Sequence, residues 1–259
     1  MKMNKKSIQM IKQMFDDHQI DEQLLTMLRL DKRKGVEKIV KQYDKQQEKV
    51  ASQMRIYEEK WKFENEFRLQ DNDLIAGVDE AGRGPLAGPV VAAAVILPKD
   101  FQLIGLTDSK QLTELERNEF FEMIKEQAIS YHISMVDNET IDQLNILKST
   151  KKAMVEALIE LKPLPNIGLI DAVSLPHLPF STKEVIKGDD KSISIAAASV
   201  LAKVTRDRLM DKMALEFPQY AFDQHKGYGT KKHLEALSIH GPSPYHRKSF
   251  APVMKYINR

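Results

Sequence analysis

The chain has 259 residues, of which 42% are hydrophobic and 29% charged, and it contains no cysteine. This composition predicts a globular protein with a sizeable core, and it excludes a disordered chain, a disulfide scaffold, a thiol nucleophile, an iron–sulfur cluster and cysteine-ligated zinc. The formal net charge of +2 does not by itself indicate a protein that binds nucleic acid.

The first 70 residues differ in composition from the rest of the chain. They contain no proline and a single glycine, and they carry 16 Lys and Arg against 12 Asp and Glu. A stretch so poor in helix-breaking residues predicts helices, at residues 5–15, 21–30 and 34–66. The composition changes at the polar residues 71–73, so we expect a helical extension over residues 1–70 and a second domain over residues 71–259.

The sequence predicts neither a signal peptide nor a membrane-spanning helix. The N-terminus is basic but lacks the apolar stretch of a signal peptide. The most apolar run, residues 90–98, has about half the length that a membrane-spanning helix requires. We therefore expect a cytoplasmic protein that does not associate with membranes.

The second domain alternates between short apolar segments and helical patterns. The apolar segments predict buried strands at residues 74–79, 90–97, 129–136, 167–171 and 184–186. The helical patterns, with a capping box at Thr113 and a break near Asn145, predict helices at residues 114–127, 138–161, 193–217 and 231–240. Three early strands followed by alternating helices and strands predict an α/β fold, with a mixed sheet covered by helices.

Two adjacent carboxylates follow the first predicted strand. Asp79 and Glu80 come at its end, before the glycine-rich sequence of residues 82–89. Neighbouring carboxylates that lose hydration repel each other, and a divalent cation would compensate for the repulsion. The alternative is that Asp79 caps a turn while Glu80 points into solvent.

Further acidic residues come at the ends of other predicted strands. Asp171 ends the strand at residues 167–171, and Asp189 and Asp190 follow the next one. Oxygen ligands without cysteine or clustered histidine favour Mg²⁺ or Mn²⁺ over zinc. Each residue alone could be a solvated turn residue, but three such strand ends together favour a carboxylate cluster. The chemistry alone does not decide between Asp189 and Asp190.

Basic residues gather near the C-terminus. Residues 203–259 hold 11 Lys and Arg against 5 Asp and Glu, and Lys203 and Arg206 lie on one face of a predicted helix. A basic surface beside a carboxylate cluster is the combination that metal-dependent phosphodiester chemistry requires. The alternatives are a solvated charged face, a nucleic-acid-binding module without activity, or a metal-dependent phosphatase or nucleotide hydrolase.

Two loops carry residues suited to a nucleic acid. Gly82, Arg83 and Gly84 permit close approach of the backbone to a polar ligand, although they match neither the dinucleotide-binding nor the Walker A fingerprint. Tyr228 lies between two glycines in a polar loop, where it can meet a sugar or a base.

These segments together resemble the bacterial ribonuclease HII family. The resemblance rests on the motifs at residues 78–90, 108–112, 170–171, 187–189, 197–207 and 225–229, which occur in the family's order. It implies an RNase H-like fold with a mixed five-stranded sheet, helices on both sides and a helical C-terminal portion. The N-terminal residues look like the helical extension of Bacillus-type members.

The resemblance also implies an activity. The family consists of metal-dependent endonucleases that cut the RNA strand of RNA–DNA hybrids, or duplex DNA at an embedded ribonucleotide. Cleavage with two ions, Mg²⁺ or Mn²⁺, leaves 3′-hydroxyl and 5′-phosphate ends. A monomer is expected.

By motif match, the catalytic and metal-binding residues would be Asp79, Glu80, Asp171 and Asp189. The distance of ten residues to Ser199 favours Asp189 over Asp190. One departure is Ala172, where many relatives have glycine. Recognition of the 2′-hydroxyl would fall to the backbone of Gly82, Arg83 and Gly84, with Tyr228 at the junction of ribose and deoxyribose. The candidates for phosphate contacts are Lys110, Ser199, Lys203 and Arg206.

Overall fold

The computed structural model describes residues 6–17 and 19–257 and divides the chain into two compact units. The border between the units lies between Ile56 and Tyr57, inside a long helix, whereas the composition changes near residue 70. In the described part of the chain, no helix combines the length and the apolar character needed to cross a membrane.

The N-terminal unit is helical, as the sequence predicts. Its helices are α1 (Ile8–Asp16), α2 (Glu22–Arg29) and the first part of α3 (Lys34–Asn65). The side chains of Ser7 and Asp21 cap α1 and α2 by accepting hydrogen bonds from backbone N–H groups in the first turn. Residue 5, where we predicted the start of the first helix, lies outside the described residues.

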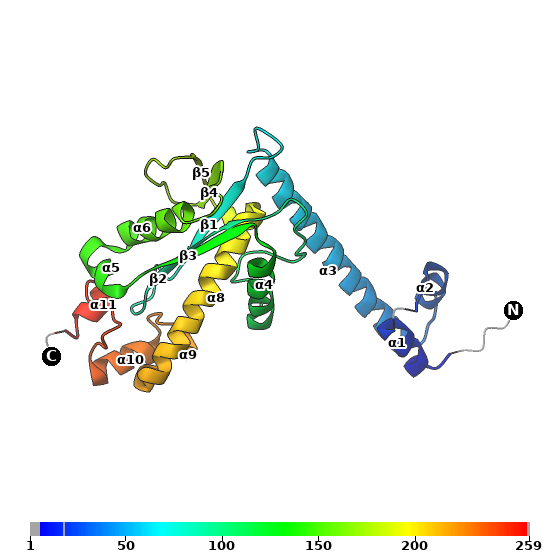
Figure 1. Ribbon diagram of the computed structural model, residues 1–259. Coiled ribbons are helices and arrows are strands. Elements are labelled where there is room, and N and C mark those ends of the chain that lie inside the picture. The colour runs from blue at the N-terminus through cyan, green and yellow to red at the C-terminus, as the bar shows by residue number, and fades with distance from the viewer. Residues whose placement is uncertain (1–5, 18, 258–259) are drawn as a thin grey trace. The chain divides into compact units, whose positions relative to one another are not determined.

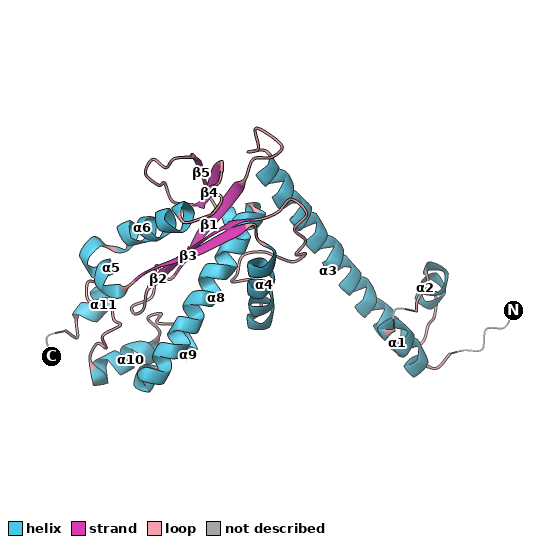
Figure 2. Ribbon diagram, viewed as in Figure 1, coloured by secondary structure: helices cyan, strands magenta, loops and turns pink. Residues whose placement is uncertain are grey.

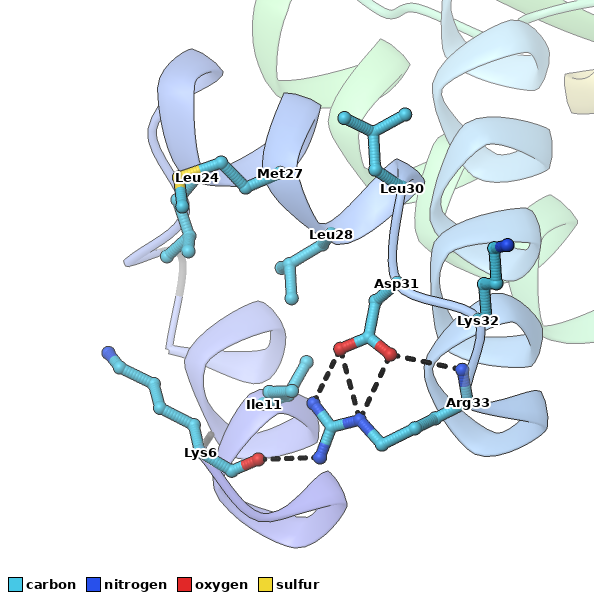
Figure 3. Close-up of a pocket in the computed structure, with 9 residues that line it drawn as sticks. All are labelled: Lys6, Ile11, Leu24, Met27, Leu28, Leu30, Asp31, Lys32 and Arg33. Atoms are coloured by element: carbon cyan, nitrogen blue, oxygen red, sulfur yellow. Dashed lines mark hydrogen bonds and ion pairs between the residues drawn. The ribbon is translucent and has the colours of Figure 1, made fainter. Parts of the chain in front are cut away.

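A small apolar core holds this unit together. Ile11, Leu28 and Val36 are buried in it, one from each helix. Figure 3 shows the pocket beside this core, where the guanidinium of Arg33 bonds both carboxylate oxygens of Asp31 and the carbonyl of Lys6. These bonds fix the turn between α2 and α3.

A mixed five-stranded sheet forms the centre of the second unit (Figures 1 and 2). Its strands are β1 (Ile75–Ala81), β2 (Val90–Ile96), β3 (Ser130–Val136), β4 (Ile167–Asp171) and β5 (Ser181–Val185). They lie in the order β3-β2-β1-β4-β5, in which β1, β2 and β3 pair antiparallel while β4 pairs parallel with both β1 and β5. The predicted mixed sheet is confirmed.

Helices cover both faces of this sheet. The described helices of this unit are α4 (Glu114–Gln127), α5 (Asn138–Leu144), α6 (Ile146–Ile159), α7 (Gly188–Lys191), α8 (Ile193–Glu216), α9 (Phe222–His225), α10 (Lys231–His240) and α11 (Ala251–Met254), with a 3₁₀ turn at Pro218–Tyr220; α4, α6 and α8 are the ones that cover the sheet. Odd-numbered residues 91–95 of β2 pack with α4 and α8, whereas even-numbered residues 92–96 pack with α6. Figure 1 shows α6 and α8 on opposite sides of the strands.

Small residues let α8 lie close to β1. Residues 196–199 are all buried, and a Cβ atom on Gly77 would come within 2.2 Å of the backbone at Ser194 and Ile195. Only glycine fits there, because a methyl group cannot approach a backbone so closely. This contact holds the first half of α8 against the strand that carries Asp79.

Two sequence predictions about this unit need correction. The fifth strand runs over residues 181–185 rather than 184–186, because it is an edge strand whose first four residues are exposed and therefore lack an apolar pattern. The helices α7, α9 and α11 were not predicted, because four residues are too few to show a helical period.

Candidate active site

The topology of the sheet brings the predicted carboxylates to one edge. Asp79 and Glu80 lie near the carboxyl end of β1, and Asp171 ends β4, which pairs parallel with β1. Asp189 lies on α7, in the connection from β5 to α8. Parallel neighbours end at the same edge of a sheet, and residues from separate parts of the chain meet there.

One pocket of about 390 Å³ at this edge contains every site residue that we predicted from the sequence. Its lining consists of Asp79, Glu80, Ala81, Gly82, Arg83, Gly84, Ser109, Lys110, Asp171, Asp189, Ser199, Lys203, Arg206 and Tyr228. Asp190 does not line it; its carboxylate is exposed and accepts a hydrogen bond from the side chain of Gln111 at 3.3 Å.

Burial and mutual repulsion act on the carboxylates together. Burial, followed by the charges of Glu80 and Asp171, raises the pKa of Asp79 well above its usual value. Burial is also the largest cause of the raised pKa of Glu80, Asp171 and Asp189. The site therefore disfavours its own negative charge and would be relieved by a cation.

The partners of these carboxylates are few. Asp171 accepts a hydrogen bond from the Gly188 N–H at 2.6 Å, and Asp79 accepts one from the Glu80 N–H at 2.7 Å. Glu80 Oε1 lies 3.2 Å from Arg83, while its Oε2 is buried without a hydrogen-bond partner among the described residues. A buried oxygen without a partner is unfavourable, which favours a ligand at this position.

The donor set fits a divalent cation that prefers oxygen. All four candidate ligands are carboxylates, which suits Mg²⁺ and Mn²⁺. In the described residues, no three Asp, Glu, His or Cys side chains are arranged as a ready-made metal site. The carboxylates thus surround the pocket without closing on a single point.

The glycine-rich loop beside the carboxylates is held by two buried arginines. Arg206 donates hydrogen bonds to the carbonyls of Ala87, Pro89 and Lys226 at 2.9–3.0 Å. Arg247 donates to the carbonyls of Gly82, Arg83, Pro85 and Gly88 at 2.6–3.0 Å. The loop is therefore shaped largely through its backbone.

This arrangement changes what we expect of Arg206. Arg206 is 1% exposed, and its guanidinium donates hydrogen bonds to backbone carbonyls. Burial lowers its pKa to about 10. A side chain so enclosed supports the loop rather than contacting a phosphate, because a phosphate ligand must reach the donor.

Lys110, Lys203 and Ser199 remain as candidates for phosphate contacts. The Lys110 side chain is 78% exposed. Lys203 forms an ion pair with Asp207 at 2.7 Å, and the Ser199 hydroxyl lies 3.0 Å from that of Ser109. The two lysines add positive charge to a pocket that also holds four carboxylates.

Histidines fix the loop that carries Tyr228. This tyrosine is 47% exposed, and its carbonyl accepts a hydrogen bond from His233 Nδ1 at 3.0 Å. His233 Nε2 lies 2.9 Å from His246 Nε2, and His246 Nδ1 accepts from the Ser243 N–H at 2.8 Å. In this series of hydrogen bonds each imidazole ring carries one proton, so both histidines are neutral. Burial lowers their pKa values, to about 4 for His233 and about 3 for His246.

Sequence reasoning missed several residues that support the site. Three of them are buried: Arg247, Lys60 and Glu64. Each stands among other charged or polar residues in the sequence, so its residue type does not distinguish it from an exposed neighbour. Their partners are more than 100 residues away in the chain. Charge alone gave no signal, because most charged residues are exposed.

Comparisons with known proteins agree on one family. The profile of ribonuclease HII matches residues 76–253, and that of the ribonuclease HII N-terminal domain matches residues 7–68. A ribonuclease HII from Oceanobacillus iheyensis is 51% identical over 250 residues, which cover 96% of each chain.

Solved structures share the fold. Ribonuclease H2 from Pyrococcus horikoshii is 26% identical and superimposes with a TM-score of 0.62 over 71% of this chain and 96% of its own. Bst-RNase HIII in complex with Mn²⁺ is 17% identical, with a TM-score of 0.54 over 71% of this chain and 68% of its own, and it shows the likeness of the fold alone.

Proposed function

Because this chain belongs to the ribonuclease HII family, we propose that it is a metal-dependent endonuclease that hydrolyses RNA strands paired with DNA. It also cuts duplex DNA on the 5′ side of an embedded ribonucleotide, leaving a 3′-hydroxyl and a 5′-phosphate. The observation that carries this proposal is the single pocket in which four carboxylates lie beside a glycine-rich backbone loop, an exposed tyrosine and two lysines.

Asp79, Glu80, Asp171 and Asp189 would hold two divalent cations, Mg²⁺ or Mn²⁺. Bound cations of this kind activate water and stabilise the charge on the leaving 3′ oxygen. The carboxylates themselves do not attack the phosphate. Their raised pKa values support this role, because burial and mutual repulsion disfavour the negative charges and a bound cation would stabilise them.

The neighbouring loops would select the substrate. The backbone from Gly82 to Gly84 faces the 2′-hydroxyl, which is the group that distinguishes RNA from DNA. Tyr228 packs on the sugar at the junction of ribose and deoxyribose. Lys110, Lys203 and the Ser199 hydroxyl hold flanking phosphates, so binding weakens as salt increases.

We propose that a monomer is active, because one chain supplies the four carboxylates, the glycine-rich loop and the tyrosine that the proposed chemistry uses. We place its activity in the cytoplasm, where bacterial DNA and its embedded ribonucleotides lie.

Substitutions of two candidate metal ligands, and of an aspartate next to one of them in the sequence, test the proposal. Asp79→Asn and Asp189→Asn are expected to abolish cleavage of a duplex that contains one ribonucleotide, in Mg²⁺ or Mn²⁺. Asp190→Asn is the matched control and is expected to retain activity, because Asp190 lies outside the pocket. The products are resolved by denaturing electrophoresis, which reports the position of the cut.

Cleavage by Asp79→Asn at the wild-type rate would refute the catalytic assignment. A cut on the 3′ side of the ribonucleotide would refute the proposed specificity. Rapid hydrolysis of small phosphate esters, independent of salt, would instead indicate a phosphatase.

A further inference from the structure

Two buried charged residues lie near the end of α3, outside the pocket. Lys60 and Glu64 are each 1% exposed. They are four residues apart and therefore lie on the same face of the helix, one turn from each other. Neither lines the pocket, and the proposed chemistry uses neither of them.

Glu64 binds the start of α8. Its Oε2 accepts hydrogen bonds from the Ser192 hydroxyl at 2.7 Å and from the Ser194 N–H at 3.0 Å, and its Oε1 accepts from the Ser194 hydroxyl at 2.8 Å. The first N–H groups of a helix have no partner within the helix, and negative charge at that end is favourable. Glu64 thus caps α8 from a helix that lies 128 residues earlier.

Lys60 binds the backbone of a candidate metal ligand. Its Nζ donates a hydrogen bond to the carbonyl of Asp189. The side chain of Asp189 faces the pocket while its carbonyl is held from α3. The N–H of the preceding residue, Gly188, donates to Asp171 at 2.6 Å, so the same short segment also orients a second carboxylate.

Packing alone does not account for this pair. Aromatic residues already anchor the end of α3, since Trp61, Phe63 and Phe67 pack against core clusters of the second unit. Burial disfavours the charge of Lys60 and lowers its pKa to about 8. Buried ionic groups are a weak source of stability compared with apolar residues of similar volume, so a gain in stability does not explain why Lys60 and Glu64 stand here.

We propose that Lys60 and Glu64 are positioning residues, which fix the segment from Gly188 to Ser194 so that Asp189 and Asp171 present their carboxylates to the metal site. The inference rests on the proposed function and deepens it. It gives the last turns of α3 a part in the active site that is separate from binding the nucleic acid.

Four full-length variants test this role. Lys60→Met removes the donor but retains a straight side chain, and Glu64→Met removes the acceptors. Glu64→Gln keeps an oxygen for Ser192 and the Ser194 N–H, and Lys62→Met changes an exposed lysine on the same helix. Thermal unfolding first establishes that each variant is folded.

Two quantities besides the rate are then measured. One is the affinity for Mn²⁺ alone, by isothermal titration calorimetry, and the other is the affinity for an RNA–DNA hybrid without metal. Lys60→Met and Glu64→Met are expected to lower kcat and Mn²⁺ affinity by roughly 10- to 100-fold, as loss of a residue behind a metal ligand does. Hybrid affinity is expected to stay unchanged, and Glu64→Gln and Lys62→Met are expected to behave as wild type.

The proposal is overturned if Lys60→Met retains the wild-type kcat and Mn²⁺ affinity, or if hybrid affinity falls in parallel with both. If Glu64→Met does not fold, Lys60→Met decides the question. A wild-type protein that binds Mn²⁺ but leaves the hybrid intact would refute the proposed function instead, and the Mn²⁺ affinities would still test positioning.

Discussion

At Asp79 the requirements of folding and of chemistry conflict. The side chain is buried beside Glu80 at the end of a core strand, where burial and neighbouring charge both raise its pKa. A carboxyl group whose pKa is raised on folding destabilises the folded state increasingly as the pH rises above the unfolded value, which is about 3.9 for aspartate. The metal-free protein therefore tolerates this carboxylate at a cost in stability, as active sites commonly do.

Asp79→Asn is accordingly expected to stabilise the metal-free protein while it abolishes cleavage. The free energy of unfolding at pH 7 should rise by roughly 0.5–2 kcal/mol, because the neutral amide escapes the repulsion. The gain should shrink as the pH falls towards 4, since the wild-type carboxyl then takes up a proton. Urea denaturation in EDTA at several pH values measures it. A variant that is less stable than wild type at pH 7 would contradict this expectation.

Gly82 is required by its backbone and by its neighbour. Its φ of +98° lies in the region that favours glycine, and a Cβ atom there would come within 2.1 Å of Arg206 Nε. Gly82→Ala is therefore expected to lower the free energy of unfolding by about 1–3 kcal/mol. Gly84→Ala is the control for stability, because its Cβ would lie at an ordinary 3.6 Å from the Tyr228 ring. Equal unfolding midpoints for the two variants would show that the loop adapts to a side chain at Gly82.

At the scale of elements, the loop from α9 to α10 depends on histidines that stay neutral. His233 and His246 form a continuous chain of hydrogen bonds from the Tyr228 carbonyl to Ser243. Protonating either ring would place two donors against each other. The hydrogen bond from the buried His233 to the Tyr228 carbonyl thus fixes the backbone of the segment that carries this exposed tyrosine.

The stability of this segment is expected to fall in acid. The pKa of His233 is lowered to about 4 in the folded protein, so its contribution is complete above the unfolded value near 6.5 and decreases as the pH falls between these values. The loss amounts to at most about 3 kcal/mol at pH 4. Unfolding free energies from pH 7 to 4 should therefore fall less steeply for His233→Gln than for wild type. His177→Gln, at an exposed position, should keep the wild-type slope.

At the scale of the whole molecule, the long helix α3 serves both units. Its first part carries the core of the N-terminal unit. Its last turn supplies Phe63, and the turn after it supplies Phe67, to a core cluster with β1, β4 and α8. Residues 1–56 carry 13 Lys and Arg against 8 Asp and Glu. The N-terminal unit is thus more basic than residues 1–70 taken together.

Two deletions are expected to behave differently. Removing residues 1–56 should leave a folded, active enzyme whose hybrid affinity depends less steeply on salt, because fewer cations contact the duplex. Removing residues 1–70 should lower the unfolding temperature and the activity, because it exposes the cluster beneath Phe63 and Phe67. Binding isotherms at several salt concentrations and thermal unfolding distinguish the two. An unchanged salt dependence after the shorter deletion would exclude a contribution of the N-terminal unit to affinity.

The sequence predicted the parts of the site that are encoded locally. Asp79, Asp171 and Tyr228 each stand in a short segment whose residue types already suggest their role, and the structure brings these segments together. Lys60 and Arg247 could not be predicted, because their function depends on carbonyls 129 and up to 165 residues away. A backbone carbonyl carries no information about residue type, so such partners leave no trace in composition or spacing.

The position of Arg247 in the chain bears on how the enzyme is made. Its guanidinium holds four carbonyls of the loop that follows β1, and these carbonyls lie 159 to 165 residues before it in the sequence. During synthesis the loop therefore leaves the ribosome long before its donor does. Strands β1 and β2 can pair earlier, but the part of the pocket proposed to distinguish RNA from DNA takes its final shape only once Arg247 has emerged.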